Sequence, residues 1–124
     1  MPTIIPTFRY DDARAAITLL CEAFGFEEHA VHEDGGVIAH AELKLGDAYI
    51  MLGQTRDENR ERVPAGPSSV YVVVEDVDAL HARAVAAGAE IMEGLTERDY
   101  GSREFAARDP AGNVWWFGTY APQD

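Results

Sequence analysis

The feature that most constrains the fold of this chain is a pattern that occurs twice. Residues 3–52 carry an apolar strand, a helix that follows an aspartate, a glycine that ends the helix, and further strands closed by a Gly-Asp turn. Residues 68–120 repeat this order. Neither half is long enough to bury a convincing core alone, so the two halves must pack together. The repeat predicts two paired βαβββ modules, and a ligand cavity would form in the surface left between them.

The helix limits follow from capping residues. The first helix has apolar residues at helical spacing up to Phe24, with Asp11 or Asp12 in the N-cap position and Gly25 at its end. The second helix begins after Asp76 or Asp78 and ends near Gly88. A later Asp-Pro-Ala-Gly-Asn run has turn residues in the order that a type I turn favours, which predicts a hairpin in the second module.

The chain is expected to form one domain, residues 1–124, with a first module at 1–53 and a second at 69–124. The linker between them, 54–68, is polar and contains two prolines and a glycine. Its run of mixed charges is interpreted as a solvated segment rather than a binding patch.

Composition limits the partners and the compartment. The net charge of −12 argues against nucleic acid, whose phosphates need clustered lysine and arginine, and it favours a neutral or cationic ligand or simply solubility. The N-terminus shows neither a signal peptide nor a membrane span, so no membrane partner is expected. The lone Cys21 excludes an internal disulfide framework and fits the cytoplasm.

Strand alternation divides the predicted sheets into two faces. One face is almost wholly apolar, as a surface covered by helices should be. It comprises Ile4, Phe8, Ile50, Leu52, Val70, Val72, Val74, Trp115 and Phe117. The opposite face mixes aromatic rings with a few hydroxyls and one cation, which is typical of a ligand pocket. It comprises Ile5, Thr7, Arg9, Tyr49, Met51, Ser69, Tyr71, Val73, Val114, Trp116 and Tyr120.

The repeat and its motifs resemble the vicinal oxygen chelate superfamily, which includes glyoxalase I, extradiol dioxygenases and bleomycin-resistance proteins. Residues 100–113, YGSREFAARDPAGN, resemble an aromatic-Gly-Arg-Glu-Phe-Ala stretch of bleomycin-binding proteins, with Ser102 as one extra residue. The resemblance implies an α+β fold with a curved, partly closed mixed sheet and helices on its outer face. It also implies a homodimer, because Pro6 falls where related proteins have a proline that hooks the N-terminal strand onto a partner.

Enzymes of this superfamily hold a divalent metal with His and Glu on the first and last strand of each module. The positions carried over to this chain are Ile5, Met51, Ser69 and Trp116. None offers an imidazole or carboxylate, and a register error of one residue does not supply them. His29 and His32 are expected to point to opposite faces of a strand, so they cannot chelate a metal together. His40 and Glu42 share a face, but they supply only two ligands without a third. No metal and no other cofactor is therefore expected.

Other chemistries remain as alternatives. Cys21 lies on the inward stripe of its helix, which favours a core residue over a nucleophile. Arg9 could hold a ligand carboxylate or pair with a neighbouring glutamate. Arg103, Glu104 and Arg108 could line the cleft or form a ladder of salt bridges.

These observations predict a metal-independent binding protein that sequesters a small aromatic or cationic molecule, such as an antibiotic or a toxin. The alternatives are a glyoxalase- or dioxygenase-like enzyme, metal-dependent or cofactor-free, and an accessory domain without a small ligand. Tyr100 occupies the place of an aromatic residue that stacks on drug rings in bleomycin-binding proteins. The predicted ligand-binding residues are Trp116, Tyr71, Tyr100, Met51, Tyr49, Ser69, Ile5, Thr7 and Arg9; no catalytic residue is predicted.

Overall fold

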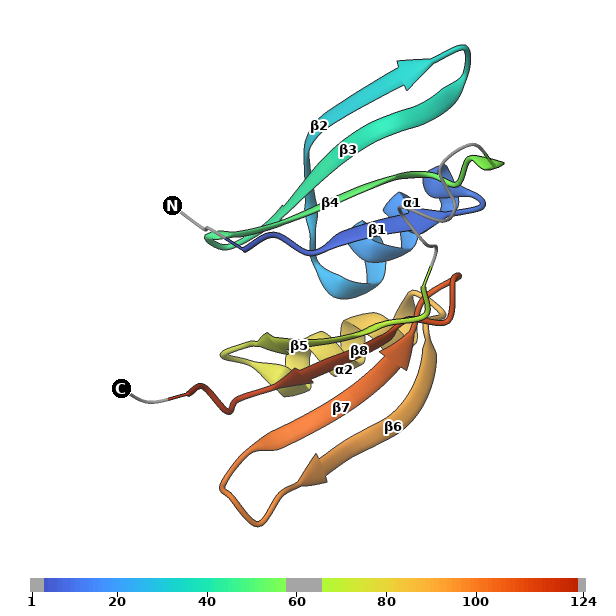
Figure 1. Ribbon diagram of the computed structural model, residues 1–124. Coiled ribbons are helices and arrows are strands. Elements are labelled where there is room, and N and C mark those ends of the chain that lie inside the picture. The colour runs from blue at the N-terminus through green and yellow to red at the C-terminus, as the bar shows by residue number, and fades with distance from the viewer. Residues whose placement is uncertain (1–3, 58–65, 123–124) are drawn as a thin grey trace.

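The structure, a computed structural model, describes residues 4–57 and 66–122 (Figure 1). The first module contains β1 (Thr7–Tyr10), α1 (Ala13–Phe24), β2 (Glu27–Asp34), β3 (Val37–Leu45) and β4 (Ala48–Gln54). The second module contains β5 (Ser69–Val73), α2 (Val77–Ala86), β6 (Glu90–Glu97), β7 (Arg103–Arg108) and β8 (Val114–Gly118). The predicted βαβββ order is therefore confirmed in both halves. Much of the predicted linker lies outside the described residues.

Each module forms its own four-stranded mixed sheet. The strand order is β1-β4-β3-β2 in the first sheet and β5-β8-β7-β6 in the second. In each sheet the first strand runs parallel to the last, and the remaining pairs are antiparallel. Within the described residues β1 and β5 each pair on one edge only, so the two sheets do not close into a barrel. The predicted α+β fold class is confirmed.

The helix ends are set by the capping residues that the sequence offers. Asp12 caps α1, and its carboxylate accepts a hydrogen bond from the Ala15 amide at 3.1 Å. Gly25 ends α1 with φ of 84°, a left-handed conformation that glycine adopts without steric cost. In the second module Asp76 accepts from the Ala79 amide at 3.0 Å and caps α2.

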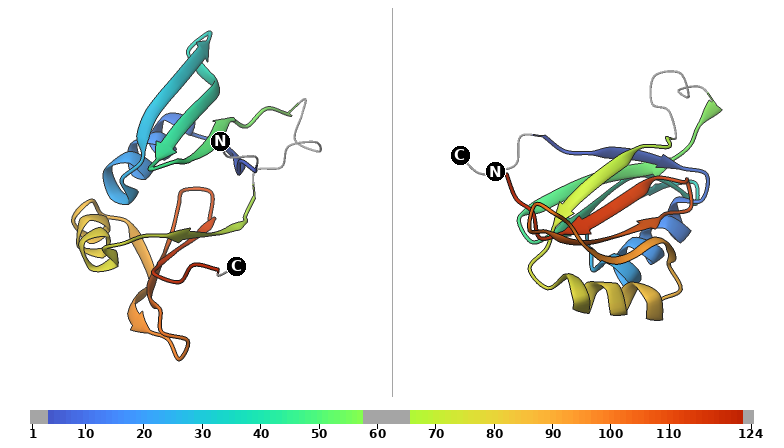
Figure 2. Two further views of the ribbon diagram at one scale, coloured as in Figure 1. Left: turned by 90° about the vertical axis from the view of Figure 1, so that its left-hand side faces the viewer. Right: turned by 90° about the horizontal axis from the view of Figure 1, so that it is seen from below.

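Both sheets turn their apolar faces toward a shared core that the two helices help to fill (Figure 2). Trp115 of β8 lies at its centre, with its ring centroid 5.3 Å from that of Phe8 in β1 and 5.8 Å from that of Phe24 in α1. The first module thus packs directly on the second. Ile4 was predicted on this face, but it precedes β1 and is 88% exposed.

The turn at residues 109–113 joins the modules. The buried Asp109 carboxylate accepts hydrogen bonds from the Tyr10 hydroxyl at 2.5 Å and from Trp115 Nε1 at 2.9 Å. Burial raises the pKa of Tyr10, and the nearby carboxylate raises it further. Asn113, also buried, accepts from the Ser68 amide at 2.7 Å, where the linker enters β5. This motif is therefore structural: it ties β1 and the linker to the second sheet.

Candidate ligand-binding site

Each sheet has one face turned away from the shared core, and we call these surfaces the first and the second open face. Strand register fixes their members, because paired residues share a face. Thr7 pairs with Met51 in the first sheet, and Tyr71 pairs with Trp116 in the second. The first open face carries the predicted site residues Thr7, Arg9, Tyr49 and Met51, and Ile5 lies just before β1. The second carries Ser69, Tyr71 and Trp116.

The second open face contains a hollow of about 580 Å³ lined by Tyr71, Tyr100, Tyr120 and Pro122. Tyr100 reaches it from the loop between β6 and β7, and its ring meets that of Tyr120 edge to face at 5.6 Å. Trp116 lies beside Tyr71 on the neighbouring strand and carries the Arg98 guanidinium 5.8 Å from its ring centroid. The structure therefore gathers four aromatic rings on this face.

A buried carboxylate holds two of these rings, those of Tyr71 and Tyr100. Glu104 of β7 is 2% exposed and shares the second open face with Trp116, because Ala106, two residues on, pairs with that tryptophan. Glu104 accepts hydrogen bonds from the hydroxyls of Tyr71 and Tyr100, each at 2.9 Å. The Ser102 hydroxyl donates at 2.9 Å and Arg98 Nε at 3.0 Å. We call these five residues the Glu104 network.

The network determines the charge of its members. Burial alone would raise the pKa of Glu104, but the hydrogen bonds from Tyr71, Tyr100, Arg98 and Ser102 together lower that pKa below its ordinary value. Burial and the bond to Glu104 raise the pKa of the Tyr100 hydroxyl. Glu104 is therefore held as an anion whose partners supply one balancing cation, and the tyrosines stay neutral donors.

Gly118 of β8 makes the network possible. A Cβ atom at this position would lie 2.6 Å from Glu104 Cγ and closer still to the Tyr71 hydroxyl. Neither atom is at the end of a freely moving side chain, since both are held in the hydrogen-bond network. A glycine here lets the carboxylate and the ring lie flat on the sheet.

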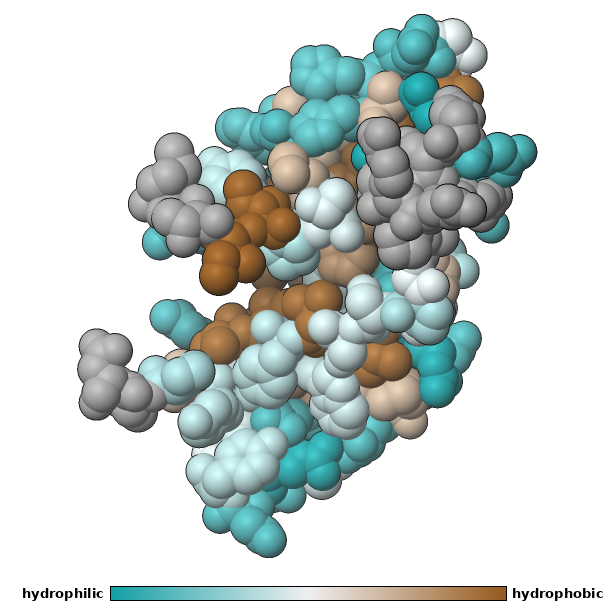
Figure 3. Space-filling view, viewed as in Figure 1, coloured by the Kyte–Doolittle hydropathy of each residue, from teal (hydrophilic) through white to brown (hydrophobic). Residues whose placement is uncertain are grey.

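The first open face lies on the other sheet, and the described hollow includes none of its residues. Because the two helix-covered faces meet in one core, both open faces look away from that core. In the view of Figure 3 a notch bordered by apolar side chains separates the modules. Met51 and Trp116 were predicted to line one cavity, but within one chain they lie on different sheets.

Three histidines gather on the first open face. His40 Nε2 lies 3.0 Å from Glu42 Oε2, and His29 Nε2 lies 3.9 Å from Glu42 Oε1. The His32 ring stacks on that of His40. The prediction that His29 and His32 face opposite sides was wrong, because pairing slips by one residue between Glu28 and Ala30. Within the described part of the chain no group of three His, Cys, Asp or Glu could hold a metal ion.

The other polar candidates of the sequence analysis have structural partners. Arg103 pairs with Asp78 at 2.6 Å, and Arg108 pairs with Glu90 at 3.0 Å. For these two arginines the ladder of salt bridges is confirmed, whereas Glu104 belongs to the open face. Arg98 and Pro122 also contribute to this face, and neither was predicted from the sequence. The alternation of Glu104 with the apolar Phe105 was the signal that could have placed the glutamate on the pocket face.

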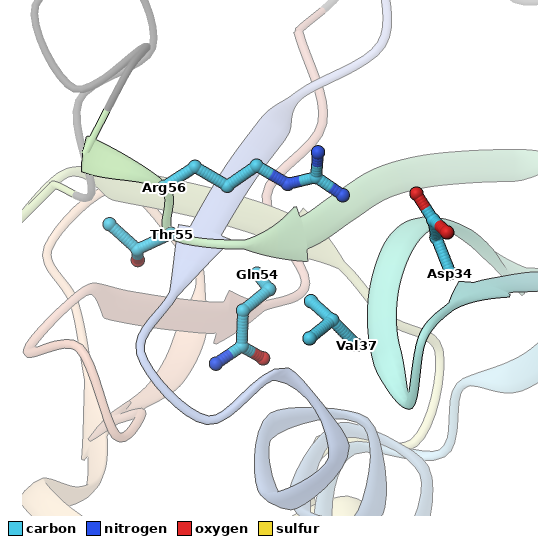
Figure 4. A pocket seen from close by; sticks show the side chains of 5 residues that line it. All are labelled: Asp34, Val37, Gln54, Thr55 and Arg56. Atoms are coloured by element: carbon cyan, nitrogen blue, oxygen red, sulfur yellow. The ribbon is translucent and has the colours of Figure 1, made fainter.

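A second hollow of about 430 Å³ lies where the β2–β3 hairpin approaches the end of β4 (Figure 4). Its lining is mostly polar and consists of Asp34, Val37, Gln54, Thr55 and Arg56. None of these residues was predicted to bind a ligand, and no aromatic ring contributes to it. The aromatic hollow is therefore the better candidate for a binding site.

The paired βαβββ modules define an α+β fold in which two four-stranded mixed sheets share one core. A profile of the Glyoxalase/Bleomycin resistance protein/Dioxygenase superfamily matches residues 5–117, and the chain belongs to this superfamily. An uncharacterized protein of Mycobacterium bovis, Mb0911c, is 30% identical over 125 residues, which covers 94% of this chain and 82% of that protein.

Solved structures agree with this assignment. TioX from Micromonospora sp. ML1 superimposes with a TM-score of 0.85 at 29% identity, covering 98% of this chain and all of TioX. A glyoxalase/bleomycin resistance protein/dioxygenase from Nocardioides gives a TM-score of 0.71 at 18% identity, covering 100% of this chain and 87% of that one. The second likeness concerns the fold alone. No described helix is long and apolar enough to cross a membrane.

Proposed function

We propose that this protein is a metal-independent, cytoplasmic homodimer that binds and sequesters a small aromatic molecule without breaking a bond in it. The observation that carries the proposal is the hollow of tyrosine rings held by the Glu104 network. Rings that are fixed before binding lose little conformational entropy when a planar ligand stacks on them. Each good ring contact contributes about 0.5–1.5 kcal/mol beyond the burial of area.

The superfamily's metal positions support binding rather than metal catalysis. By the family resemblance, these positions fall at Ile5, Met51, Ser69 and Trp116, and none of these side chains is a ligand that Zn, Ni, Mn or Fe prefers. Titrations of the purified protein in the presence of EDTA test this point. A ligand that binds only after metal is restored, or that is turned over, would favour the glyoxalase- or dioxygenase-like alternative.

The homodimer is proposed from the unpaired edges of the two sheets. β1 and β5 each have a free edge in the described structure, and Ile4, Ile5 and Val73 are exposed there. A second copy that sets its β5 beside β1 would cover these edges. It would also bring its aromatic hollow beside Met51 and Arg9, so that one cavity draws on both modules.

We expect light scattering to report a species of twice the 13.6 kDa chain mass at micromolar concentration. Val73→Glu should shift the equilibrium toward monomer, because it places a charge at the proposed edge. Val85→Glu, an equally exposed valine on α2, is the matched control and should leave the mass unchanged. A monomeric wild-type protein at high micromolar concentration would contradict the proposed dimer.

Trp116→Ala should weaken binding of a planar aromatic ligand by about 1–3 kcal/mol while the fold stays intact. The ligand is the tightest binder from a thermal-shift screen of planar aromatic compounds and antibiotics, and affinity is measured by calorimetric titration. Val85→Ala on α2 serves as the control. Equal affinities of wild type and Trp116→Ala would contradict the placement of the site.

A further inference from the structure

The charges on the two open faces are distributed unevenly. The chain has 22 acidic and 10 basic residues, yet the first open face carries Arg9 and Lys44, the only lysine of the sequence. It also carries three of the four histidines, as their contacts with one another, Glu42 and Tyr49 show. Glu42 lies among the histidines, and its pKa is lowered chiefly by the hydrogen bond from His40. A second carboxylate, Glu27, pairs with Lys44 in the strand register. The two cations and the two carboxylates named here balance, so this face is far less acidic than the chain as a whole.

On the first open face, Arg9 is a cation without a hydrogen-bonded partner among the described residues. Its side chain makes no hydrogen bond or ion pair with the described residues, and its buried Nε has no acceptor. Arginine stays charged in proteins, so it cannot relieve this situation by losing its proton. A partly buried guanidinium without a counter-charge is costly in free energy, so the side chain is poised to accept an anion.

Gly53 gives Arg9 its place on the sheet. The two residues pair across β1 and β4, and the Arg9 guanidinium lies over Gly53. A Cβ at position 53 would meet the guanidinium and would also lie 2.7 Å from the Ala39 carbonyl oxygen. The absence of a side chain thus keeps this position open for the arginine head.

Glu104 and Glu42 already have hydrogen-bond donors, so neither carboxylate is an unpartnered site for a cation in the way that Arg9 is for an anion. Glu104 already accepts from four donors and is balanced by Arg98, which also pairs with Glu93 at 2.5 Å. Glu42 is engaged by His40. The net charge of the whole chain would attract a cation from solution, but contacts in the cavity decide the affinity of the bound state.

We infer that the ligand of this protein carries an anionic oxygen group, a carboxylate or a phosphate, which Arg9 receives while the aromatic part lies on the rings of the second open face. This inference rests on the proposed function, in which a second copy sets the aromatic hollow beside the first open face. It narrows the ligand class from small aromatic molecules of any charge to aromatic anions.

Three small ligands with the same aromatic ring system and different charges test the inference. Naphthalene-2-carboxylate, naphthalene-2-carboxamide and 2-naphthylmethylammonium share a ring system and differ in charge. We expect the wild-type protein to bind the carboxylate at least tenfold tighter than the carboxamide, and the ammonium compound most weakly. Naphthalene-2-phosphate then distinguishes the two anion types.

Variants assign the preference to Arg9. Arg9→Gln should bring the carboxylate within about twofold of the carboxamide while the affinity for the carboxamide is unchanged, and Arg9→Lys should keep part of the preference. Arg14→Gln, which removes an exposed arginine paired with Glu33 on the helix side, is the matched control and should behave as wild type. Light scattering checks that every variant keeps the assembly of the wild type.

The outcomes separate the two proposals. If the carboxamide binds but the carboxylate binds no tighter, or if Arg9→Gln keeps the tenfold preference, the anion inference is wrong and the aromatic site stands. Tightest binding of the ammonium compound would overturn it in favour of a cationic ligand. If none of the naphthalene probes binds, the proposed aromatic site fails and the anion inference fails with it.

Discussion

Replacing Trp115 with alanine should lower the free energy of unfolding by about 4 kcal/mol, which is within the range for loss of a buried aromatic side chain. Trp115 is fully buried, and its ring meets Phe8 and Phe24 from the first module. Its Nε1 also donates to Asp109, so the substitution leaves a hydrogen-bond acceptor without one of its donors. Urea denaturation followed by circular dichroism measures the change.

The next residue provides the control. Trp116 is the same residue type on the same strand, but it lies on the second open face, so Trp116→Ala should cost less than about 1 kcal/mol of stability. Trp115→Phe keeps an aromatic ring and should give an intermediate loss if Trp115→Ala does not fold. Equal losses for Trp115→Ala and Trp116→Ala would contradict the assignment of the two faces.

This contrast between neighbours was predictable from sequence because side chains alternate along a strand regardless of tertiary detail. Parity placed Trp115 and Phe117 on the helix-covered face, and both are fully buried. The capping aspartates and Gly25 likewise act through local backbone conformation, which neighbouring residues decide. The repeated pattern then sufficed for the fold class.

Two parts of the site could not be predicted in this way. Parity fails at a bulge, and the slip after Glu28 places His29 and His32 on the same open face. Strand alternation also says nothing about how two modules pack. The prediction therefore grouped Met51 with Trp116, although each lies on its own sheet. Both points concern contacts between strands or between modules rather than a property of one strand.

The Glu104 network is a third feature that the sequence could not predict. It forms only because several segments of the chain meet at one carboxylate. Tyr71 comes from β5, Arg98 and Tyr100 from the loop after β6, and Ser102 from the residue before β7. Each of these residues alone has an ordinary surface interpretation. Only their convergence on a buried acid distinguishes a rigid ligand platform from a ladder of surface charges.

Glu104→Gln should lower the free energy of unfolding at pH 7 by about 3 kcal/mol, as expected when one member of a buried ion pair is removed. The amide keeps the shape of the side chain, but its NH₂ group faces donors where an anion accepted four hydrogen bonds. Glu90→Gln, on the same sheet and paired with Arg108 at the surface, is the matched control and should cost less than about 1 kcal/mol.

The difference between wild type and Glu104→Gln should depend on pH in a defined direction. The pKa of Glu104 is lower in the folded protein than in the unfolded chain, where a glutamate has a pKa of about 4.3. Its contribution to stability is therefore fully present above the unfolded pKa and is lost as the pH falls through the folded pKa. Urea titrations from pH 7 to pH 3 should show the two unfolding free energies converging at the acid end. A difference that stays constant over this range would contradict an anionic Glu104 at the centre of the platform.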